Sequence, residues 1–341
     1  MIYTIFTGGT IGSSMKGDTS VSVSEAAAPG LIERYQSIGE PQTDFKTVAP
    51  ISILSENLEA QHLLTIISEV RTGLTQPGID GIIITHGTDT LQYTAAILSY
   101  IFADVSIPII MVSSNYILED DRANGFINFY FAVRFIEEGL GRGVFVSYCN
   151  DGELPTIHRG NRLGNPVVFS DYVYSVRGQF YGQYECDTDD MSSWPSAAYK
   201  PCSKYRIDPE NTRKLFSDEE IRISTVSSGI LKVNAAPGMV YPGIPEYTRA
   251  ILLNSYHSGT ICLDSRMNIF LEEAHGRDVP VFLLGLAQDA TKYETMKAYD
   301  EYGIIPLYDC APISQYCKLW LLMSNDIDIS DGMMRCYCEE R

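Results

Sequence analysis

The chain has 341 residues, of which 45% are hydrophobic and 20% charged, and its 43 acidic and 25 basic residues give a formal net charge of −18. This composition is that of a globular protein with a sizeable core, and the length favours two domains. A nucleic-acid binder is not expected, because so acidic a chain repels phosphate and no basic stripe interrupts it. A membrane-spanning protein is excluded as well, since no apolar run approaches the roughly 18 residues that a bilayer requires.

The start of the chain and the cysteines indicate the cellular compartment. Residues 1–7 lead directly into Gly8-Gly9 without a basic start or a long apolar stretch, which is typical of a first strand and not of a signal peptide. All eight cysteines lie at or after Cys149, and Cys336 and Cys338 form only a C-x-C pair, which is too little for a zinc site. We therefore expect a cytoplasmic protein with free thiols and with no metal or other cofactor.

In the N-terminal half, short β-branched runs alternate with longer helix-like runs. The predicted strands cover 2–6, 51–54, 82–84, 107–112 and 143–146, and the predicted helices cover 59–70, 91–103 and 121–138. Runs this apolar are typical of strands that are buried on both faces. Strands and helices alternating at this spacing predict right-handed βαβ units and a mainly parallel sheet flanked by helices. In such a sheet ligands bind at the carboxyl ends of the strands.

The alternation breaks between residues 186 and 220, where Asp, Ser, Pro, Tyr and Lys follow one another without periodicity. This segment is predicted to be a linker or a surface insertion. Strand-like runs then resume at 250–253, 279–286 and 304–308, with a predicted helix at 290–302. We predict an α/β fold with a larger N-terminal domain over 1–185 and a smaller C-terminal α/β domain over 221–341.

The first candidate site segment is Thr7-Gly8-Gly9-Thr10-Ile11-Gly12, where the first predicted strand ends. Adjacent glycines let the backbone turn sharply and approach a ligand closely, which leaves the Thr10 hydroxyl in the crevice. A plain β-turn is the alternative. A dinucleotide loop is disfavoured, because its glycines would follow the G-x-G-x-x-G spacing.

Two further segments place oxygen-bearing side chains between a strand and a helix. Thr88, Asp89 and Thr90 follow the strand at 82–84. A helix cap needs one such residue, so three in a row leave both capping and ligand binding open. Ser55-Glu56-Asn57 precedes the helix at 59–70 and by itself is typical of an N-cap.

Together these segments resemble the bacterial-type L-asparaginases, a family of two-domain amidohydrolases that includes the asparaginase-glutaminases. T-G-G-T-I-G at 7–12 and T-H-G-T-D-T at 85–90 match the two signatures of that family residue for residue. The resemblance extends over most of the chain, and two of its segments are most similar to the cytoplasmic type I branch. The further matching segments are 121–128, 157–162, 241–244 and 255–259.

The resemblance implies hydrolysis of the side-chain amide of asparagine to aspartate and ammonia through an acyl-enzyme. Thr10 would attack the amide carbon, and Thr88 would place a second hydroxyl on its other side. Asp89 would polarise the network and bind the substrate α-ammonium. Ser55 would bind the α-carboxylate, with Glu56 standing where the family usually has glutamine or serine. A free amino acid carries both charges, so its pocket must supply a carboxylate and several donors.

The chain departs from the family at the groups that activate a threonine hydroxyl. The family lysine should fall near position 165, where this chain has Asn165, and no lysine occurs between Lys46 and Lys200. Arginine cannot substitute, because guanidinium stays protonated. The family tyrosine on the loop after the first signature is missing too, and Thr19 or Ser20 falls in its place.

Two other positions bear on the same site. Thr260 stands where the family has an asparagine contributed by a neighbouring subunit. Lys16, on the loop after the first signature, could supply an amine in place of the missing lysine. Each lost acid–base group would cost ~10²-fold in rate or more, so weak catalysis is expected.

Hypotheses from different functional classes remain. The first is an amidohydrolase of the asparaginase family that acts on asparagine or a related amide. The second is a catalytically impaired amino-acid-binding or regulatory protein. The third is the amidotransferase relative that acts on misacylated transfer RNA, which would call for a further N-terminal domain and a basic surface. The resemblance also implies a small-molecule substrate and a homodimer or homotetramer.

Overall fold

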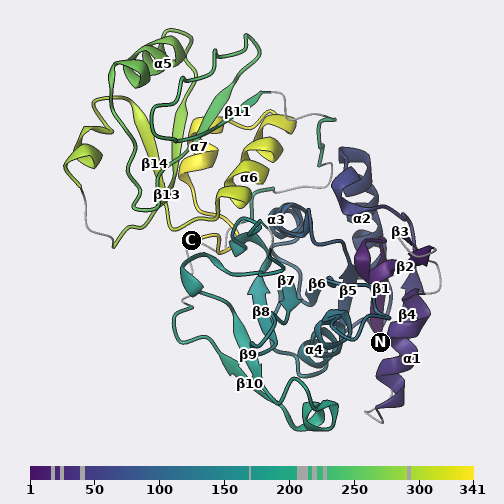
Figure 1. Ribbon diagram of the computed structural model, residues 1–341. Helices are drawn as coiled ribbons and strands as arrows, with labels where there is room; N and C mark the ends of the chain where they lie inside the picture. Colours follow the sequence, from purple (N-terminus) through teal and green to yellow (C-terminus); the bar gives the residue numbers. More distant parts are fainter. Residues whose placement is uncertain are drawn as a thin grey trace.

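The computed structural model describes residues 1–16, 20–23, 27–38, 43–168, 170–205, 214–216, 221–225, 229–289 and 293–341. It contains a large mixed sheet, a smaller parallel sheet and helices around both, as Figure 1 shows. The predicted α/β class, with a larger and mainly parallel first sheet and a smaller second one, is confirmed.

The large sheet has eight strands in the order β10-β9-β8-β7-β6-β5-β1-β4. The first five of these strands along the chain are parallel and the last three are antiparallel. Every residue of the central strands β1, β5, β6 and β7 is buried, which explains why their sequences are apolar without alternation. The strands are β1 (Ile2–Phe6), β4 (Phe45–Val48), β5 (Gly81–Thr85), β6 (Pro108–Val112), β7 (Gly143–Tyr148), β8 (Thr156–Arg159), β9 (Gly182–Glu185) and β10 (Ala198–Pro201).

Helices cover both faces of this sheet. On one face, α2 (Ala60–Leu74) and α3 (Leu91–Ile101) share a core with Ile5, Ile82 and other strand residues. On the other face, α1 (Ala27–Ser37) and α4 (Gly125–Glu137) pack against the side chains that point the opposite way. The first signature loop continues into a small hairpin of β2 (Ser13–Lys16) and β3 (Ser20–Val23). Thr19 lies outside the described residues.

The smaller sheet is entirely parallel, in the order β11-β12-β13-β14. Its outer face packs on α5 (Ser265–His275). Its inner face packs on α6 (Pro312–Ser324), which belongs to the same core as α3 of the large sheet, and α7 (Ile329–Met334) follows α6. The strands are β11 (Ile230–Asn234), β12 (Ala250–Asn254), β13 (Val281–Leu286) and β14 (Ile304–Tyr308).

The predicted strand at 51–54 is wrong. The strand that pairs with β1 is β4, and in 51–54 only Ile53 forms a bridge, with Gly8. β4 is an edge strand whose central Lys46 and Thr47 are exposed, so no continuous apolar run marks it in the sequence. The apolar residues at 51–54 instead follow β4, and Ile53 bonds to Thr7 and Gly9 after the end of β1.

The predicted helix at 290–302 is also wrong over the part that the structure describes. That part contains a short 3-10 helix, η7 (Glu294–Ala298), followed by turns. Tyr293, Thr295 and Tyr299 are β-branched or aromatic residues with low helix propensity, which is consistent with a helix that does not extend.

The segment predicted as a linker or insertion contains ordered structure. Residues 198–201 form β10 in the large sheet, and the short helix η5 (Met191–Ser196) buries Trp194. The domain boundaries at 185 and 220 stay a prediction. Among the described residues, no helix is both long and apolar enough to cross a bilayer, and all eight cysteines are free thiols.

Candidate active site

Three loops meet in close backbone contact at the carboxyl edge of the large sheet. A Cβ on Gly9 would lie 2.5 Å from the Cα of Gly87 and would collide with its nitrogen. A Cβ on Gly87 would likewise collide with the Ser55 hydroxyl. Gly9 also has a φ of +74°, which a residue with a side chain rarely adopts. The glycines of both signatures are therefore required for the two loops and the Ser55 loop to touch.

Hydrogen bonds hold these loops together. The Thr7 hydroxyl donates to the carbonyl of Thr85 at 2.6 Å, which joins the ends of β1 and β5. The Gly9 N–H donates to the Ile53 carbonyl at 2.9 Å, and the Thr90 hydroxyl donates to the Ser55 carbonyl at 2.9 Å. Each signature loop is thus bonded to the 53–55 segment. The threonines that surround Thr10 and Thr88 in the motifs act as scaffold.

His86 fixes the second signature loop from beneath. Its Nδ1 lies 2.8 Å from the Gly87 carbonyl, and its Nε2 lies 2.9 Å from the Thr94 hydroxyl. A carbonyl only accepts, so the network assigns the proton to Nδ1 and makes Nε2 the acceptor for Thr94. Burial lowers the pKa of His86 to about 4, although the Gly87 bond opposes the shift. The ring is therefore neutral at physiological pH and orients the peptide that precedes Thr88.

The five predicted site residues come from these three loops. Thr10 begins the short helix η1 (Thr10–Gly12) and is half-buried, as is Thr88. Ser55 is buried at the start of η2 (Ser55–Asn57), whereas Glu56 and Asp89 are exposed. The structure brings the loops that carry all five residues to one edge of the sheet, and their chemical roles stay a prediction.

A cavity of about 340 Å³ lies beside the second signature loop, and Thr88 and Asp89 form part of its wall. Gln92, at the start of α3, and Tyr148, at the end of β7, line the same cavity. The segment 166–173, with 169 outside the described residues, closes the other side and contributes Asp171. Sequence reasoning missed these three polar residues, because nothing in the motifs marks a side chain that reaches the cavity from a neighbouring element.

Asn165 and Thr260, two of the residues that depart from the family pattern, are not among the residues that line this cavity. Asn165 is exposed and lines a separate cavity of about 150 Å³ together with Lys232 and Asn254. Thr260 follows β12, where its hydroxyl lies 3.2 Å from that of Ser258. Lys16 ends β2. No lysine, arginine or histidine is among the described residues that line the cavity beside Thr88.

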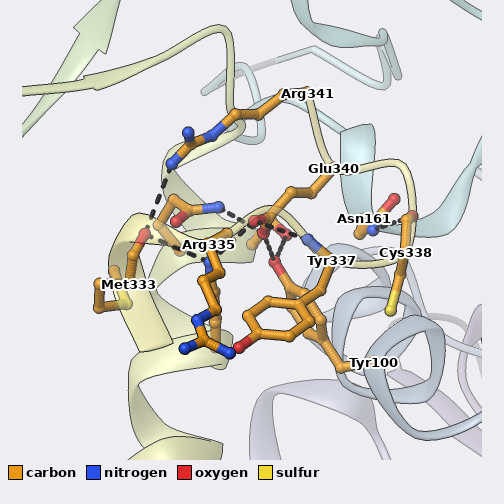
Figure 2. Close-up of polar contacts among 11 residues, drawn as sticks. Tyr100, Asn161, Met333, Arg335, Tyr337, Cys338, Glu340 and Arg341 are labelled. Carbon is orange, nitrogen blue, oxygen red and sulfur yellow. Dashed lines mark hydrogen bonds and ion pairs between the residues drawn. The ribbon is translucent and has the colours of Figure 1, made fainter. Parts of the chain in front are cut away.

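The segment that leads to Asn165 is anchored by the C-terminal residues, which lie at the junction of the two sheets (Figure 1). Asn161 donates to the Cys338 carbonyl at 2.7 Å, and Arg162 donates to the Glu339 carbonyl at 3.2 Å. Figure 2 shows the Glu340 carboxylate at the centre of a polar cluster that includes Tyr100 of α3. Burial, reinforced by Glu340, raises the pKa of the Tyr100 hydroxyl well above its usual range, so this group stays a donor.

Comparison with known proteins identifies relatives of the chain. Residues 1–165 match the family model described as Asparaginase, N-terminal. The L-asparaginase of Thermococcus kodakarensis is 25% identical over 264 residues, which cover 74% of this chain and 72% of that protein. A glutamyl-tRNA(Gln) amidotransferase subunit from Methanothermobacter thermautotrophicus is 24% identical over 343 residues, which cover 97% of this chain and 74% of that protein.

The match to a further relative is partial. The corresponding amidotransferase protein from Methanopyrus kandleri is 29% identical over 162 residues, which cover 46% of this chain and only 35% of that protein. The matched part of the chain therefore spans about a third of the length of that relative.

A solved structure shares the fold over the whole chain. The crystal structure of L-asparaginase I from Vibrio cholerae matches with a TM-score of 0.74 at 22% identity, covering 99% of this chain and 98% of that one. Both sheets and the connections between them are therefore those of the asparaginase fold. Residues 1–165 therefore match the asparaginase family model, and the chain shares the asparaginase fold throughout.

Proposed function

We propose that this protein is an amidohydrolase that hydrolyses the side-chain amide of asparagine, or of a closely related compound, through a threonine nucleophile. The observation that carries the proposal is the backbone contact between Gly9 and Gly87. This contact brings together the loops that carry Thr10 and Thr88, with Ser55 packed against Gly87. The match of residues 1–165 to the asparaginase family model supports amide hydrolysis as the reaction class.

In the proposed reaction, the Thr10 oxygen attacks the amide carbon and forms a tetrahedral intermediate. The proton of the hydroxyl passes to the amide nitrogen, the C–N bond breaks and ammonia leaves an ester on Thr10. Water then attacks the ester carbon, gives its proton back to the Thr10 oxygen and releases the carboxylate. Thr88 donates a hydrogen bond on the other side of the reacting carbon, where it stabilises the developing charge.

Substrate recognition in this proposal follows from charge. Asp89 is exposed at the cavity and binds the α-ammonium group of the amino acid. Ser55 and Glu56 start a short helix next to the Gly87 contact, where the serine hydroxyl binds the α-carboxylate. Glu56 adds a negative charge at this end of the substrate. The Glu56 carboxylate therefore favours a substrate with an additional hydrogen-bond donor near its α-carboxylate.

Activation of the Thr10 hydroxyl sets the rate in the proposed mechanism. A threonine needs a neighbouring base, and the described residues that line the cavity beside Thr88 include no lysine or histidine. The proposed enzyme is consequently slow on asparagine.

A second candidate is an amino-acid-binding or regulatory protein without turnover, which the Asn165 position favours. A third is a component of an amidotransferase, since one relative of that name aligns over 74% of its length. The net charge of −18 argues against transfer RNA as a direct ligand of this chain. We also propose a cytoplasmic location and a homodimer or homotetramer, on the family resemblance.

The test measures ammonia release from asparagine, glutamine and a panel of amides at millimolar concentration, alongside calorimetric binding of aspartate. Release of ammonia that Thr10→Ala abolishes supports the first candidate. Binding of aspartate without release of ammonia supports the second. Ammonia release that persists in Thr10→Ala contradicts the assigned nucleophile.

A further inference from the structure

A cavity of about 530 Å³ lies at the antiparallel end of the large sheet. Strands β8 and β9 contribute the polar side chains of Thr156, His158 and Gln183 to its wall. Thr156 and His158 lie two residues apart on one strand and Gln183 pairs with Thr156, so the three side chains share one face of the sheet. Residues of the segment 172–180 form a second wall. The volume is within the range of about 300–1,000 Å³ that is typical of sites for small organic ligands.

One buried atom in the wall of this cavity has no partner. His158 is only 3% exposed, and its Nδ1 lies 2.8 Å from the Ser175 hydroxyl. Its Nε2 has no hydrogen-bond partner among the residues that the structure describes. Buried polar atoms in folded proteins are nearly always paired. An unpaired ring nitrogen in the wall of a cavity therefore indicates a polar ligand atom beside it.

The His158 ring is neutral and can pair with a ligand of either kind. Burial lowers its pKa to about 3, so the ring carries a single proton at physiological pH. If the Ser175 hydroxyl donates to Nδ1, the proton is on Nε2, which then donates to the ligand. If the hydroxyl accepts from Nδ1 instead, Nε2 accepts. Because the hydroxyl can rotate, this pair adapts to a donor or an acceptor at the edge of the ligand.

Other polar groups of the wall already have partners within the described part of the chain. The Thr156 hydroxyl donates to a backbone carbonyl and accepts from the Gln183 amide, both at 2.9 Å. The Glu153 carboxylate accepts from Tyr172 at 3.1 Å and from Asn150 at 3.0 Å. A sugar would bring many hydroxyl groups that need partners which this wall does not offer. The ligand therefore has few polar atoms, one of which meets the imidazole.

Aromatic rings and charge restrict the ligand further. The rings of Tyr172 and Tyr174 lie 6.2 Å apart with their planes at 26°, and Phe180 lines the same cavity. A flat aromatic ligand packs well on such rings. No lysine or arginine is among the described lining residues, whereas Glu153 and Asp187 are exposed there, so an anion would have no countercharge. A metal ion is also disfavoured, because nowhere in the described ranges are three metal-ligating side chains grouped to hold one.

We propose that this cavity binds an uncharged, planar nitrogen heterocycle with one or two rings. Its rings pack on Tyr172, Tyr174 and Phe180, and its edge hydrogen-bonds to the His158 Nε2. The site is separate from the cavity beside Thr88, with which its described wall shares only Tyr172 and Val173. Binding is measured directly, so failure of the proposed amide hydrolysis does not affect the result.

The test titrates the full chain at neutral pH with adenine, indole and quinoline, which are all uncharged there. Indole can only donate from its ring nitrogen and quinoline can only accept. Glucose and indole-3-carboxylate are the references for a sugar and for an anion. Binding is followed by calorimetry and by saturation-transfer NMR of the ligand protons. We expect saturable binding of the three heterocycles and none of the two references. Binding of indole alone would also support the proposal and identify Nε2 as an acceptor, and binding of quinoline alone would identify it as a donor.

Variants locate the site. His158→Phe keeps a ring but removes both nitrogens, and we expect it to weaken binding about tenfold or more. Tyr174→Leu removes a half-buried ring of the second wall and should weaken binding about three- to tenfold. The matched controls are the same substitutions at exposed residues outside this wall, His257→Phe and Tyr247→Leu, which should keep the wild-type affinity.

Three results would overturn the proposal. The first is that none of the three heterocycles binds saturably. The second is that glucose or indole-3-carboxylate binds as tightly as the heterocycles. The third is unchanged affinity in both His158→Phe and Tyr174→Leu. If His158→Phe does not fold, Tyr174→Leu decides, and wild-type affinity in that variant then overturns the proposal.

Discussion

The Lys318 ammonium and the Glu340 carboxylate lie 2.8 Å apart, and neither side chain is exposed to solvent. Lys318 also donates to the carbonyl of Arg335 at 2.6 Å, and Glu340 accepts from Gln315 at 2.8 Å and from Tyr100. Lys318 and Gln315 belong to α6, whereas Tyr100 belongs to α3 beneath the large sheet. This ion pair therefore joins the C-terminal residues to both parts of the molecule.

Removing one partner of this pair will be costly, because it leaves the other charge buried and unpaired. We expect Glu340→Gln to lower the free energy of unfolding by about 3–5 kcal/mol. The control is Asp331→Asn, which breaks an exposed ion pair with Arg335 and should cost less than about 1 kcal/mol. Urea unfolding of the two variants measures both values. Equal losses of unfolding free energy in the two variants would show that burial does not increase the contribution of the Lys318–Glu340 pair.

The buried histidines predict how stability depends on pH. Burial lowers the pKa of His86 to about 4 and that of His158 to about 3, so the folded chain binds fewer protons than the unfolded chain below about pH 6.5. Stability therefore falls as the pH drops from about 6.5 to about 4, by at most about 1.4 kcal/mol per pH unit for His86. Unfolding at pH 7 and pH 4.5 measures the slope.

The contribution of His86 is isolated by comparing slopes. His86→Gln does not titrate, so its slope should be shallower than that of the wild-type chain. His257→Gln, at an exposed position, is the control and should keep the wild-type slope. A His86→Gln slope equal to that of the wild-type chain would mean that the ring does not stay neutral in the fold.

Thr10→Ala and Thr88→Ala should each reduce ammonia release by ~10²-fold or more, since each removes a hydroxyl assigned to the reacting carbon. Both residues lie in loops at strand ends, so far-UV circular dichroism and the unfolding midpoint should stay close to those of the wild-type chain. Thr72→Ala, at an exposed helix position, is the control for a threonine outside the site. Undiminished release from Thr10→Ala would refute the nucleophile.

Turnover of asparagine by the wild-type chain should lie below the usual enzyme range of about 1–10³ s⁻¹, and Asn165→Lys should raise it. The amide of Asn165 cannot accept a proton from a hydroxyl network at neutral pH, whereas a lysine with a lowered pKa can. The gain will be partial, because Asn165 lines the neighbouring cavity and the loop tyrosine is missing too. Asn165→Gln, which adds length without a base, is the control. A wild-type rate within the usual range would contradict the prediction and make Lys16→Ala the next variant.

The sequence predicted the central strands of the large sheet and the positions of both signature loops. These features are local, because a buried parallel strand is apolar along its whole length and a tight backbone approach demands glycine. Strand β4 was not predicted, because it is a half-exposed edge strand in which Lys46 and Thr47 interrupt any apolar run. Helix α6 and strand β11 were not predicted either.

The composition of the cavity beside Thr88 could not be predicted from the motifs. Gln92 and Tyr148 lie on different elements, and only the fold brings both side chains to one cavity with residues 166–173. The anchoring of Asn161 and Arg162 by the C-terminal residues is equally non-local, since it joins positions 177 residues apart. A motif indicates the chemistry of its own residues, but it does not indicate which residues of other elements pack against them.

The placement of α6 makes the two halves of the molecule unfold together. This helix contributes to one continuous core that includes α3 under the large sheet and the inner faces of β12 and β13. Neither half can separate without exposing that shared apolar surface, so a calorimetric scan should show a single endotherm. Limited proteolysis of the native chain should likewise release neither half intact. Access of small molecules to the sheet edge then depends on short-range loop movement, because hinge opening between the halves would break this core.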